Sequence, residues 1–313
     1  MPALLVIAQT LLIVALAPLF DGAIATMKAR LQMRRGPGLG QRYADLARLL
    51  HKESIVSADA SWLARVTPYV AFGASVAIAT WIPVLVASHP MSFAGDLVMT
   101  VALLALVRVL SALAALECGT AFGGMAASRH LALSALAEPA LMLAVFTLAL
   151  GAGSTDLAHI SRATALAPHG WLSPSHLLAF AAVWLVAISE TGRVPVDNPV
   201  THLELTMVHE GLVLDYSGRH LALLQWGSAI RQMVLFTLIA SLFVPWGIAL
   251  EPSAPLVGGA LLAWLGKLAV FAAIVAVTES VTAKMRLFRV PEFLGMAFLL
   301  SLLALTTDSV LRG

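Results

Sequence analysis

Five carboxylates lie within one short stretch of the chain, between residues 190 and 215. They are Glu190, Asp197, Glu204, Glu210 and Asp215. A carboxylate exchanges protons near neutral pH when an apolar setting disfavours its charged form and raises its pKa. The chemistry that this stretch predicts is proton exchange, and the five residues are our candidate proton-coupling group.

Local patterns offer structural roles for two of these carboxylates. Thr201 and Glu204 have the spacing of a capping box, so we expect a helix to begin there, with Glu204 as its cap. Glu210 would interrupt an apolar face of that helix, and an ion pair with Arg193 or Arg219 is its alternative role. The apolar members of that face are Leu203, Met207 and Leu214.

A second set of ionisable residues lies within or at the ends of apolar stretches, namely Arg108, Glu117, Glu138, Lys267 and Glu279. A charge at the centre of a membrane span costs ~2.5–3.5 kcal/mol on insertion scales, so each must face a bundle interior, a partner or water. Arg108 and Glu117 fall on opposite sides of a helix and are not expected to pair. Snorkelling is the alternative for Glu117 and Glu279. We expect Glu138, Lys267 and Glu279 to continue the proton-coupling group into the membrane, although a buried structural network has the same composition.

Metal and nucleophile motifs are not completed anywhere in the sequence. His209 and Glu210 begin a zinc-protease pattern, but Val213 stands where the second histidine belongs. Gly266 and Lys267 do not form a phosphate-binding loop, and Cys118, the single cysteine, excludes a cysteine-ligated cluster or structural zinc. We therefore expect no metal or redox centre in this chain, and its redox chemistry would lie in another polypeptide.

The composition defines the kind of element that must position these groups. The chain has 313 residues, of which 60% are hydrophobic and 12% charged, with a mean hydropathy of +0.91. Soluble domains carry about 25% charged residues. These values exclude a soluble enzyme, a disordered chain and a nucleic-acid-binding protein, and they predict an all-α, polytopic membrane protein whose residues 1–313 form one transmembrane domain.

Eight stretches approach the roughly 20 apolar residues that a membrane-spanning helix needs. The expected spans are Ala3–Phe20, Val66–Val86, Leu97–Leu116, Leu131–Leu150, Leu172–Ile188, Ile230–Ile248, Pro255–Val277 and Phe293–Leu305. The first is not expected to be a signal peptide, because its positive charges follow the apolar run instead of preceding it.

The distribution of positive charge predicts the orientation. Of the 19 lysines and arginines, fifteen fall in the odd connections, with Arg231 at the edge of the sixth span counted in the fifth connection. Two fall in the even connections and termini, and Arg108 and Lys267 lie within spans. The positive-inside rule then places the odd connections in the cytoplasm and both termini outside, in a plasma (inner) membrane.

Two cytoplasmic connections, at about 28–65 and 190–229, are long enough to dock a partner. The first begins with a turn-rich stretch of Arg34, Arg35, Gly36 and Pro37, and an amphipathic helix follows over Gln41–Lys52. Such a helix lies in the membrane interface or docks another subunit, and lipid headgroups are the alternative partner of the basic segment. The second connection is the acidic one described above.

Two motifs resemble those of a known family. Glu190, Thr191, Arg193, Pro195, Asp197 and Pro199 match the signature of respiratory complex I subunit 1, an eight-helix subunit at the joint between peripheral and membrane arms. Arg35, Gly36 and Pro37, followed by Gln41, Asp45, Lys52 and Glu53, resemble its first cytoplasmic loop. The likeness extends over nearly the whole chain.

Departures from that signature point to one branch of the family. Val200 and His202 stand where quinone-reducing members carry glutamates after the last proline, and of that run Glu204 alone is kept. Residues 207–218 and 284–293 resemble the group 4 membrane-bound hydrogenase branch, of the formate hydrogenlyase type. The resemblance implies a non-catalytic membrane anchor and redox–proton coupling subunit, and it argues against a bound quinone.

The same resemblance implies the partners. These are hydrogenase-like large and small peripheral subunits that carry nickel–iron and iron–sulfur centres, antiporter-like membrane subunits and the lipid bilayer. The alternative is a quinone-site subunit of an NADH-quinone oxidoreductase-type complex. An independent secondary transporter is disfavoured, because the sequence shows no internal repeat.

Overall fold

The computed structural model describes residues 2–56, 60–87, 95–167, 172–197, 208–251 and 253–312. Over these ranges the chain is helical, and its extended contacts are two isolated bridges without a named strand. The helices are α1 (Pro2–Leu31), α2 (Gln41–His51), α3 (Trp62–Trp81), α4 (Leu97–Glu117), α5 (Ala121–Ala152), α6 (Leu157–Leu166), α7 (Pro174–Glu190), η3 (Glu210–Val213), α8 (Gly218–Leu242), α9 (Ala254–Val281), η4 (Leu287–Arg289) and α10 (Val290–Arg312). The all-α prediction is confirmed.

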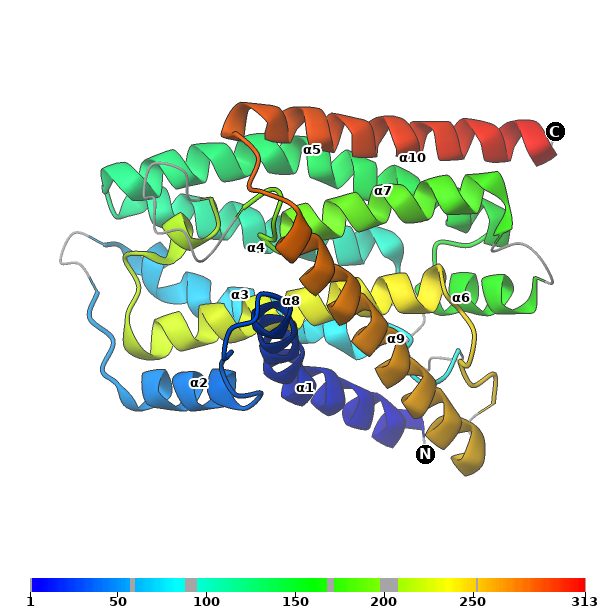
Figure 1. Cartoon of the computed structure of the whole chain (residues 1–313), viewed down its shortest axis with the longest axis horizontal. Helices are drawn as coiled ribbons and strands as arrows, with labels where there is room; N and C mark the ends of the chain where they lie inside the picture. The colour runs from blue at the N-terminus through cyan, green and yellow to red at the C-terminus, as the bar shows by residue number, and fades with distance from the viewer. Residues whose placement is uncertain are drawn as a thin grey trace.

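The helices identify a multi-pass membrane protein. Within the described residues, seven helical stretches are long and apolar enough to cross a membrane, and α7 is a shorter apolar helix of 17 residues. All eight predicted spans therefore have a helical counterpart, while the eighth membrane crossing stays a prediction. In Figure 1 the two chain ends lie toward the same end of the bundle, opposite the α2 connection.

Several helices are longer than the apolar stretches from which they were predicted. α1 continues to Leu31 through Lys28 and Arg30, α5 begins ten residues before the predicted Leu131, and α8 begins at Gly218 instead of Ile230. Hydropathy marks where the apolar run ends, whereas the backbone hydrogen-bond ladder continues through polar residues that find partners. The predicted connections 28–65 and 190–229 are accordingly shorter at these ends.

Side-chain caps explain where many of the helices begin. Ser61, Thr120, Asp156 and Ser173 each accept a hydrogen bond from a backbone N–H in the first turn of the helix that follows, at 3.1–3.3 Å. Pro174 then occupies the first position of α7, where its missing N–H costs nothing. One of these caps begins α6, a ten-residue helix that the apolar pattern did not predict.

Helix packing arranges the bundle in two groups. α10 lies along α5 and α7, and α5 also packs on α4 (Figure 1). α1 packs on α8, α9 and α3, while α8 lies against α3 and α9 crosses obliquely (Figure 1). The tight contacts between α5 and its neighbours are lined by small residues, which include Ala137, Ala140 and Ala144. Small side chains allow membrane helices to approach closely.

Two prolines inside helices leave carbonyl groups that other helices satisfy. Pro18 has no N–H for the carbonyl of Val14, and Trp226 Nε1 donates to that oxygen at 3.0 Å. At Pro68 the hydroxyl of Tyr216 donates to the carbonyl four residues earlier, also at 3.0 Å. These bonds tie α8 and the segment before it to α1 and α3.

The first connection folds back onto the bundle. The predicted amphipathic helix is α2, which packs on α1 and α8. The hydroxyl of Tyr43 donates to the carbonyl of Ala15, and Thr26 Oγ1 donates to the carbonyl of Pro37 at 2.9 Å. Arg34 and Arg35 remain exposed at its turn. The connection is therefore a built surface that displays positive charge.

The fifth connection differs from its prediction. The expected helix start at Thr201, with Leu203, Glu204 and Met207, lies outside the described residues, as does Pro199. The described end of the segment forms one turn of 3-10 helix, η3, and Leu214 after it is 49% exposed. Over the described residues 210–214 the predicted continuous helical face is wrong, because a 3-10 turn that packs on α4 and α5 replaces the expected α-helix.

Candidate functional site

A buried arginine joins three helices at the first part of the site. Arg108 of α4 is 5% exposed, and its Nη1 lies 2.9 Å from Glu138 Oε1 of α5 and 3.3 Å from Glu190 Oε1 at the end of α7. Its Nε donates to the carbonyl of Leu104. One cation thus holds two carboxylates from different helices. As expected, Arg108 does not pair with Glu117.

A second arginine forms a similar bridge three residues beyond Glu190. Arg193 is 7% exposed and contacts Asp21 of α1, Glu279 of α9 at 3.4 Å and Gln232 of α8 at 3.0 Å. Lys28 of α1 lies 2.8 Å from the other oxygen of Glu279. This network ties α1, α8 and α9 to the end of α7.

The Arg193 network reaches the surface through α2. Arg42 of α2 lies 2.7 Å from Asp21 Oδ2, and its side chain is half exposed. Asp21 therefore bridges the exposed Arg42 and the buried Arg193. A change in the position of α2 would therefore move Arg42 relative to Asp21 and alter the ion pair between Asp21 and Arg193.

The third part of the site is the ion pair of Asp197. Lys284 Nζ lies 2.9 Å from Asp197 Oδ1, and the backbone N–H groups of Val208 and His209 donate to Oδ2 at 3.2 and 3.4 Å. Burial alone would raise the pKa of this carboxyl, but His209 and Lys284 stabilise the carboxylate and hold its pKa well below the usual range. Asp197 thus stays charged and fixes the loop after α7 to the segment before η4.

The segment from residue 190 to 197 connects all three parts. α7 ends at Glu190, and Gly192 turns the chain with a φ of +62°, a conformation that glycine adopts without a Cβ penalty. The chain then presents Arg193 and Asp197 four residues apart, and the carbonyl of Pro195 accepts a hydrogen bond from Met285 N at 2.9 Å. Side chains within eight residues of sequence thereby contact α1, α4, α8, α9 and the segment before η4, and they are linked to α5 through Arg108.

Two predicted carboxylates lie beside this site and stabilise local structure. Asp215 Oδ2 accepts a hydrogen bond from Thr120 Oγ1 at 2.9 Å, at the start of α5. Glu117 accepts from the backbone N–H groups of Ser61 and Ala64 at 2.6 and 3.1 Å, and so caps α3. Glu117 therefore has a structural partner in place of the snorkelling that its position suggested.

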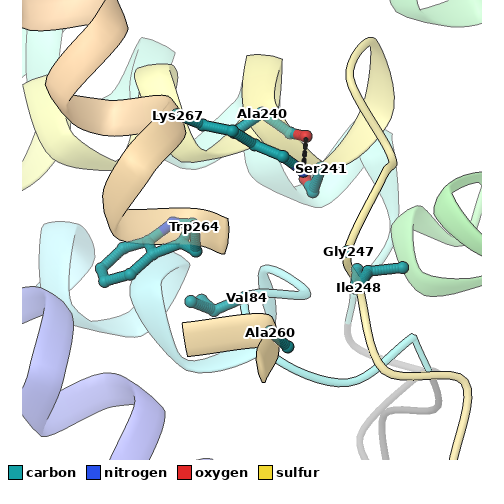
Figure 2. A pocket seen from close by; sticks show the side chains of 8 residues that line it. All are labelled: Val84, Ala240, Ser241, Gly247, Ile248, Ala260, Trp264 and Lys267. Carbon is teal, nitrogen blue, oxygen red and sulfur yellow. Dashed lines mark hydrogen bonds between the residues drawn. The ribbon is translucent and has the colours of Figure 1, made fainter. Parts of the chain in front are cut away.

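Other predicted site residues are placed as follows. Glu210 begins η3 and is half-buried, and the contacts of Arg193 described above are with other groups. Lys267 makes its hydrogen bonds away from the three-part site, beside a small pocket (Figure 2). Its ammonium donates to the carbonyls of Ala240 and Val244 at the end of α8, where a helix dipole favours a cation. Trp264 and Ser241 line a small pocket beside it.

Sequence reasoning missed partners that complete the site. Asp21, Lys28 and Gln232 were not singled out, nor was Lys284. Asp21 and Lys28 lie seven residues apart on α1, and this spacing places two charges on one face of a helix. That signal was available in the sequence, whereas nothing local marks Gln232.

The described residues contain no group of three histidine, cysteine, aspartate or glutamate side chains arranged to hold a metal ion. The groups that the structure brings together are cations and carboxylates in alternation. Such an arrangement supports proton exchange or a conformational response to charge, because each ion is stabilised by neighbours that belong to a different helix.

Comparisons with known proteins give the chain its relatives. A family model described as NADH dehydrogenase matches residues 3–307. Hydrogenase-4 component C of Escherichia coli K12 is 34% identical over 95% of this chain and 93% of its own length. Formate hydrogenlyase subunit 4 of the same organism is 35% identical over 95% of this chain and 97% of its own length.

Two further matches are more distant. An NADH-quinone oxidoreductase subunit of Thermomicrobium roseum is 31% identical over 69% of both chains. A chain in the structure of the membrane-bound sulfane sulfur reductase, an archaeal respiratory membrane complex, matches with a TM-score of 0.81 over 97% of this chain and 99% of its own length. At 20% identity, this last likeness concerns the fold.

Proposed function

This chain belongs to the NADH dehydrogenase family, of the complex I subunit 1 type, and we propose that it is the membrane-anchor and redox–proton coupling subunit of a group 4 nickel–iron hydrogenase-type complex, formate hydrogenlyase-like. The observation that carries this proposal is the eight-residue segment 190–197, which links Glu190, Arg193 and Asp197 to charged partners in different helices. In our proposal it passes a change at the cytoplasmic surface to the membrane domain.

The proposed coupling group follows from the site. Glu190, Glu138 and Glu279 exchange protons or shift their ion pairs within the buried networks, and Asp197 anchors the connection. Glu204, Glu210 and Asp215 are proposed members at the cytoplasmic face. Lys267, which lies apart from these networks at the end of α8, is proposed as a separate proton-coupling residue. Arg108 and Arg193 hold the carboxylates in place, because a buried carboxylate without a cation is costly.

The proposed partners match the exposed surfaces. Hydrogenase-like large and small peripheral subunits, which would carry the nickel–iron and iron–sulfur centres, dock on the basic turn of Arg34, Arg35, Gly36 and Pro37. Antiporter-like membrane subunits contact the bundle laterally. We place the complex in the plasma membrane with the first and fifth connections in the cytoplasm, since these connections carry most of the positive charge.

A quinone-site subunit is the second candidate function. The NADH-quinone oxidoreductase relative supports it, but that relative aligns with 69% of this chain, whereas the two hydrogenase-type relatives each align with 95%. Val200 and His202 also replace the glutamates expected after the signature. A purified complex whose electron transfer requires added quinone would favour this candidate over the hydrogenase-type subunit.

The replacement Glu190→Gln tests the coupling role in the assembled complex. Glutamine keeps the shape of the side chain and removes its titrating proton. We expect the complex to assemble and its peripheral subunits to reduce an artificial dye. Proton-coupled turnover should fall at least tenfold, because proton transfer by a positioned side chain typically contributes about 10²-fold or more. Glu251→Gln, at an exposed carboxylate, is the matched control. Full coupled turnover of Glu190→Gln would refute the role of this carboxylate.

A further inference from the structure

His209 lies next to the site with one ring nitrogen in an unusual state. Its Nδ1 is buried, has no hydrogen-bond partner among the described residues and lies 3.8 Å from Asp197 Oδ2. A buried polar nitrogen is normally hydrogen-bonded, so one that is not, beside a charged carboxylate, needs a structural or functional explanation. The side chain itself is 27% exposed, so the ring joins the interior to the surface.

The ring of His209 contacts a second histidine. The ring centroids of His209 and His130 are 5.1 Å apart, with the planes nearly perpendicular at 78°. His130 belongs to α5 and is 6% exposed. The space around His209 is tight, because a Cβ atom at Gly192 would lie 3.0 Å from Nδ1. The pair is therefore held in place by the turn that ends α7.

His130 begins a polar stripe on α5 that ends in the Arg108 network. His130, Ser134 and Glu138 lie at intervals of four residues, so they occupy successive turns of one helix face. Side chains four residues apart are about 5–6 Å apart at Cβ. Ser134 is 6% exposed, and Glu138 contacts Arg108 at 2.9 Å. The stripe thus leads from the histidine pair to the buried carboxylates.

Charged groups surround both rings. Asp197 and Lys284 lie on the side of His209, while the positive charges of Arg108 and Arg231 act on His130 together with His209. A neutral imidazole accepts a proton at one ring nitrogen and donates from the other, so it passes a proton on without keeping the charge.

We propose that His209 and His130 form an imidazole bridge that carries protons from the surface beside the Asp197–Lys284 pair to Glu138. His209 takes a proton from water at the exposed edge of its ring, and the charged Asp197, 3.8 Å from Nδ1, stabilises the transient imidazolium. His209 then releases a proton to His130, which passes one through the Ser134 hydroxyl to Glu138. Each ring ends neutral, and no oxidant or reductant is needed. This bridge rests on the proposed coupling function and adds its route.

Chemical rescue tests the bridge in the purified complex. In His209→Gly we expect proton uptake coupled to turnover to fall at least tenfold, and added imidazole to restore it through the partly exposed site. Pyrazole, a ring of the same shape that binds protons poorly, should not restore it. His220→Gln is the matched control, because His220 is also half-buried against aromatic rings and lies away from Asp197. Undiminished uptake, or a loss that imidazole does not repair, overturns the bridge.

A second measurement separates this inference from the proposed function. Nitrogen-15 spectra of the histidine rings in the full chain should show the His209 signals shifting in both His130→Gln and Asp197→Asn, because both groups lie against the His209 ring and act on its protonation. If the wild-type complex takes up no protons, the proposed function fails and the spectra still decide on the bridge. His209 signals that respond to neither variant overturn it.

Discussion

Replacing Arg193 by glutamine should destabilise the chain through charge imbalance. The buried Arg193 and Glu279, with the partly buried Asp21 and Lys28, form a group whose charges cancel, so Arg193→Gln leaves a net charge of −1 that the half-exposed Arg42 offsets only in part. Removing one partner of a buried ion pair costs ~3–5 kcal/mol. Glu279 keeps Lys28 at 2.8 Å and Asp21 keeps Arg42 at 2.7 Å, so we expect the lower end of that range.

The predicted loss is measured as the free energy of unfolding of the full chain in mixed micelles. A change of ~3 kcal/mol corresponds to about a 150-fold shift in the folding equilibrium. Arg48→Gln is the matched control, because Arg48 pairs with Asp45 at 3.3 Å on the surface. Exposed pairs contribute about 0–1 kcal/mol, so this control should change stability little.

A double variant separates charge balance from lost packing. Arg193→Gln with Glu279→Gln restores a neutral group around Asp21 and Lys28, so its loss should be smaller than the sum of the two single losses by about 0.5–3 kcal/mol. Strict additivity, or an Arg193→Gln loss no larger than that of Arg48→Gln, would refute the reasoning.

Further predictions concern orientation, docking and pH. In a cysteine-free chain, Asp45→Cys should react with an impermeant label only from the cytoplasmic side and Glu251→Cys only from outside; the reverse pattern would contradict the topology. Replacing Arg34 and Arg35 by glutamate should release the peripheral subunits without preventing membrane insertion, because a repulsive rim slows association; an unchanged salt sensitivity of binding would speak against docking there. Burial raises the pKa of Asp197, but His209 and Lys284 lower it by more, so that it lies below its ordinary value of 3.8. The charged Asp197 therefore contributes fully to stability above pH 3.8, and this contribution is lost as the pH falls below 3.8. Asp197→Asn should therefore destabilise the chain at pH 7, with a stability difference that shrinks progressively below pH 3.8; a constant difference across this range would show that charge is not the cause.

Much of the fold followed from the sequence, because a membrane imposes strong local rules. The apolar runs, including the one that forms α7, and the amphipathic α2 appear at the predicted places. The ends of α1, α5 and α8 did not, since polar residues there stay helical when partners elsewhere satisfy them. The local sequence pattern predicts whether a residue is buried or exposed. It does not predict the hydrogen-bond or ion-pair partner, because that partner lies far away in the sequence.

For the candidate site, too, the sequence predicted many of the residues but not the contacts between them. The sequence identified Arg108, Glu138 and Glu279 as charges within or at the ends of apolar runs, where a charge needs an explanation. It identified Glu190 as a carboxylate of the fifth connection and Arg193 as part of the family motif. It did not assign their partners. Arg108 was expected to avoid Glu117, which is correct, yet its contacts with Glu138 and Glu190 depend on how α4, α5 and α7 pack.

By itself, the sequence determined that this protein is a helical membrane bundle with a charged connection after α7, and its motifs determined the family. Only the tertiary structure decided that segment 190–197 joins two buried ion networks, that Lys267 lies apart from them and that His209 meets His130. The physical reason is the separation along the chain over which each kind of interaction acts. Hydropathy and capping act between neighbours in the chain, whereas an ion pair or ring contact between helices depends on packing that brings together residues more than 70 positions apart.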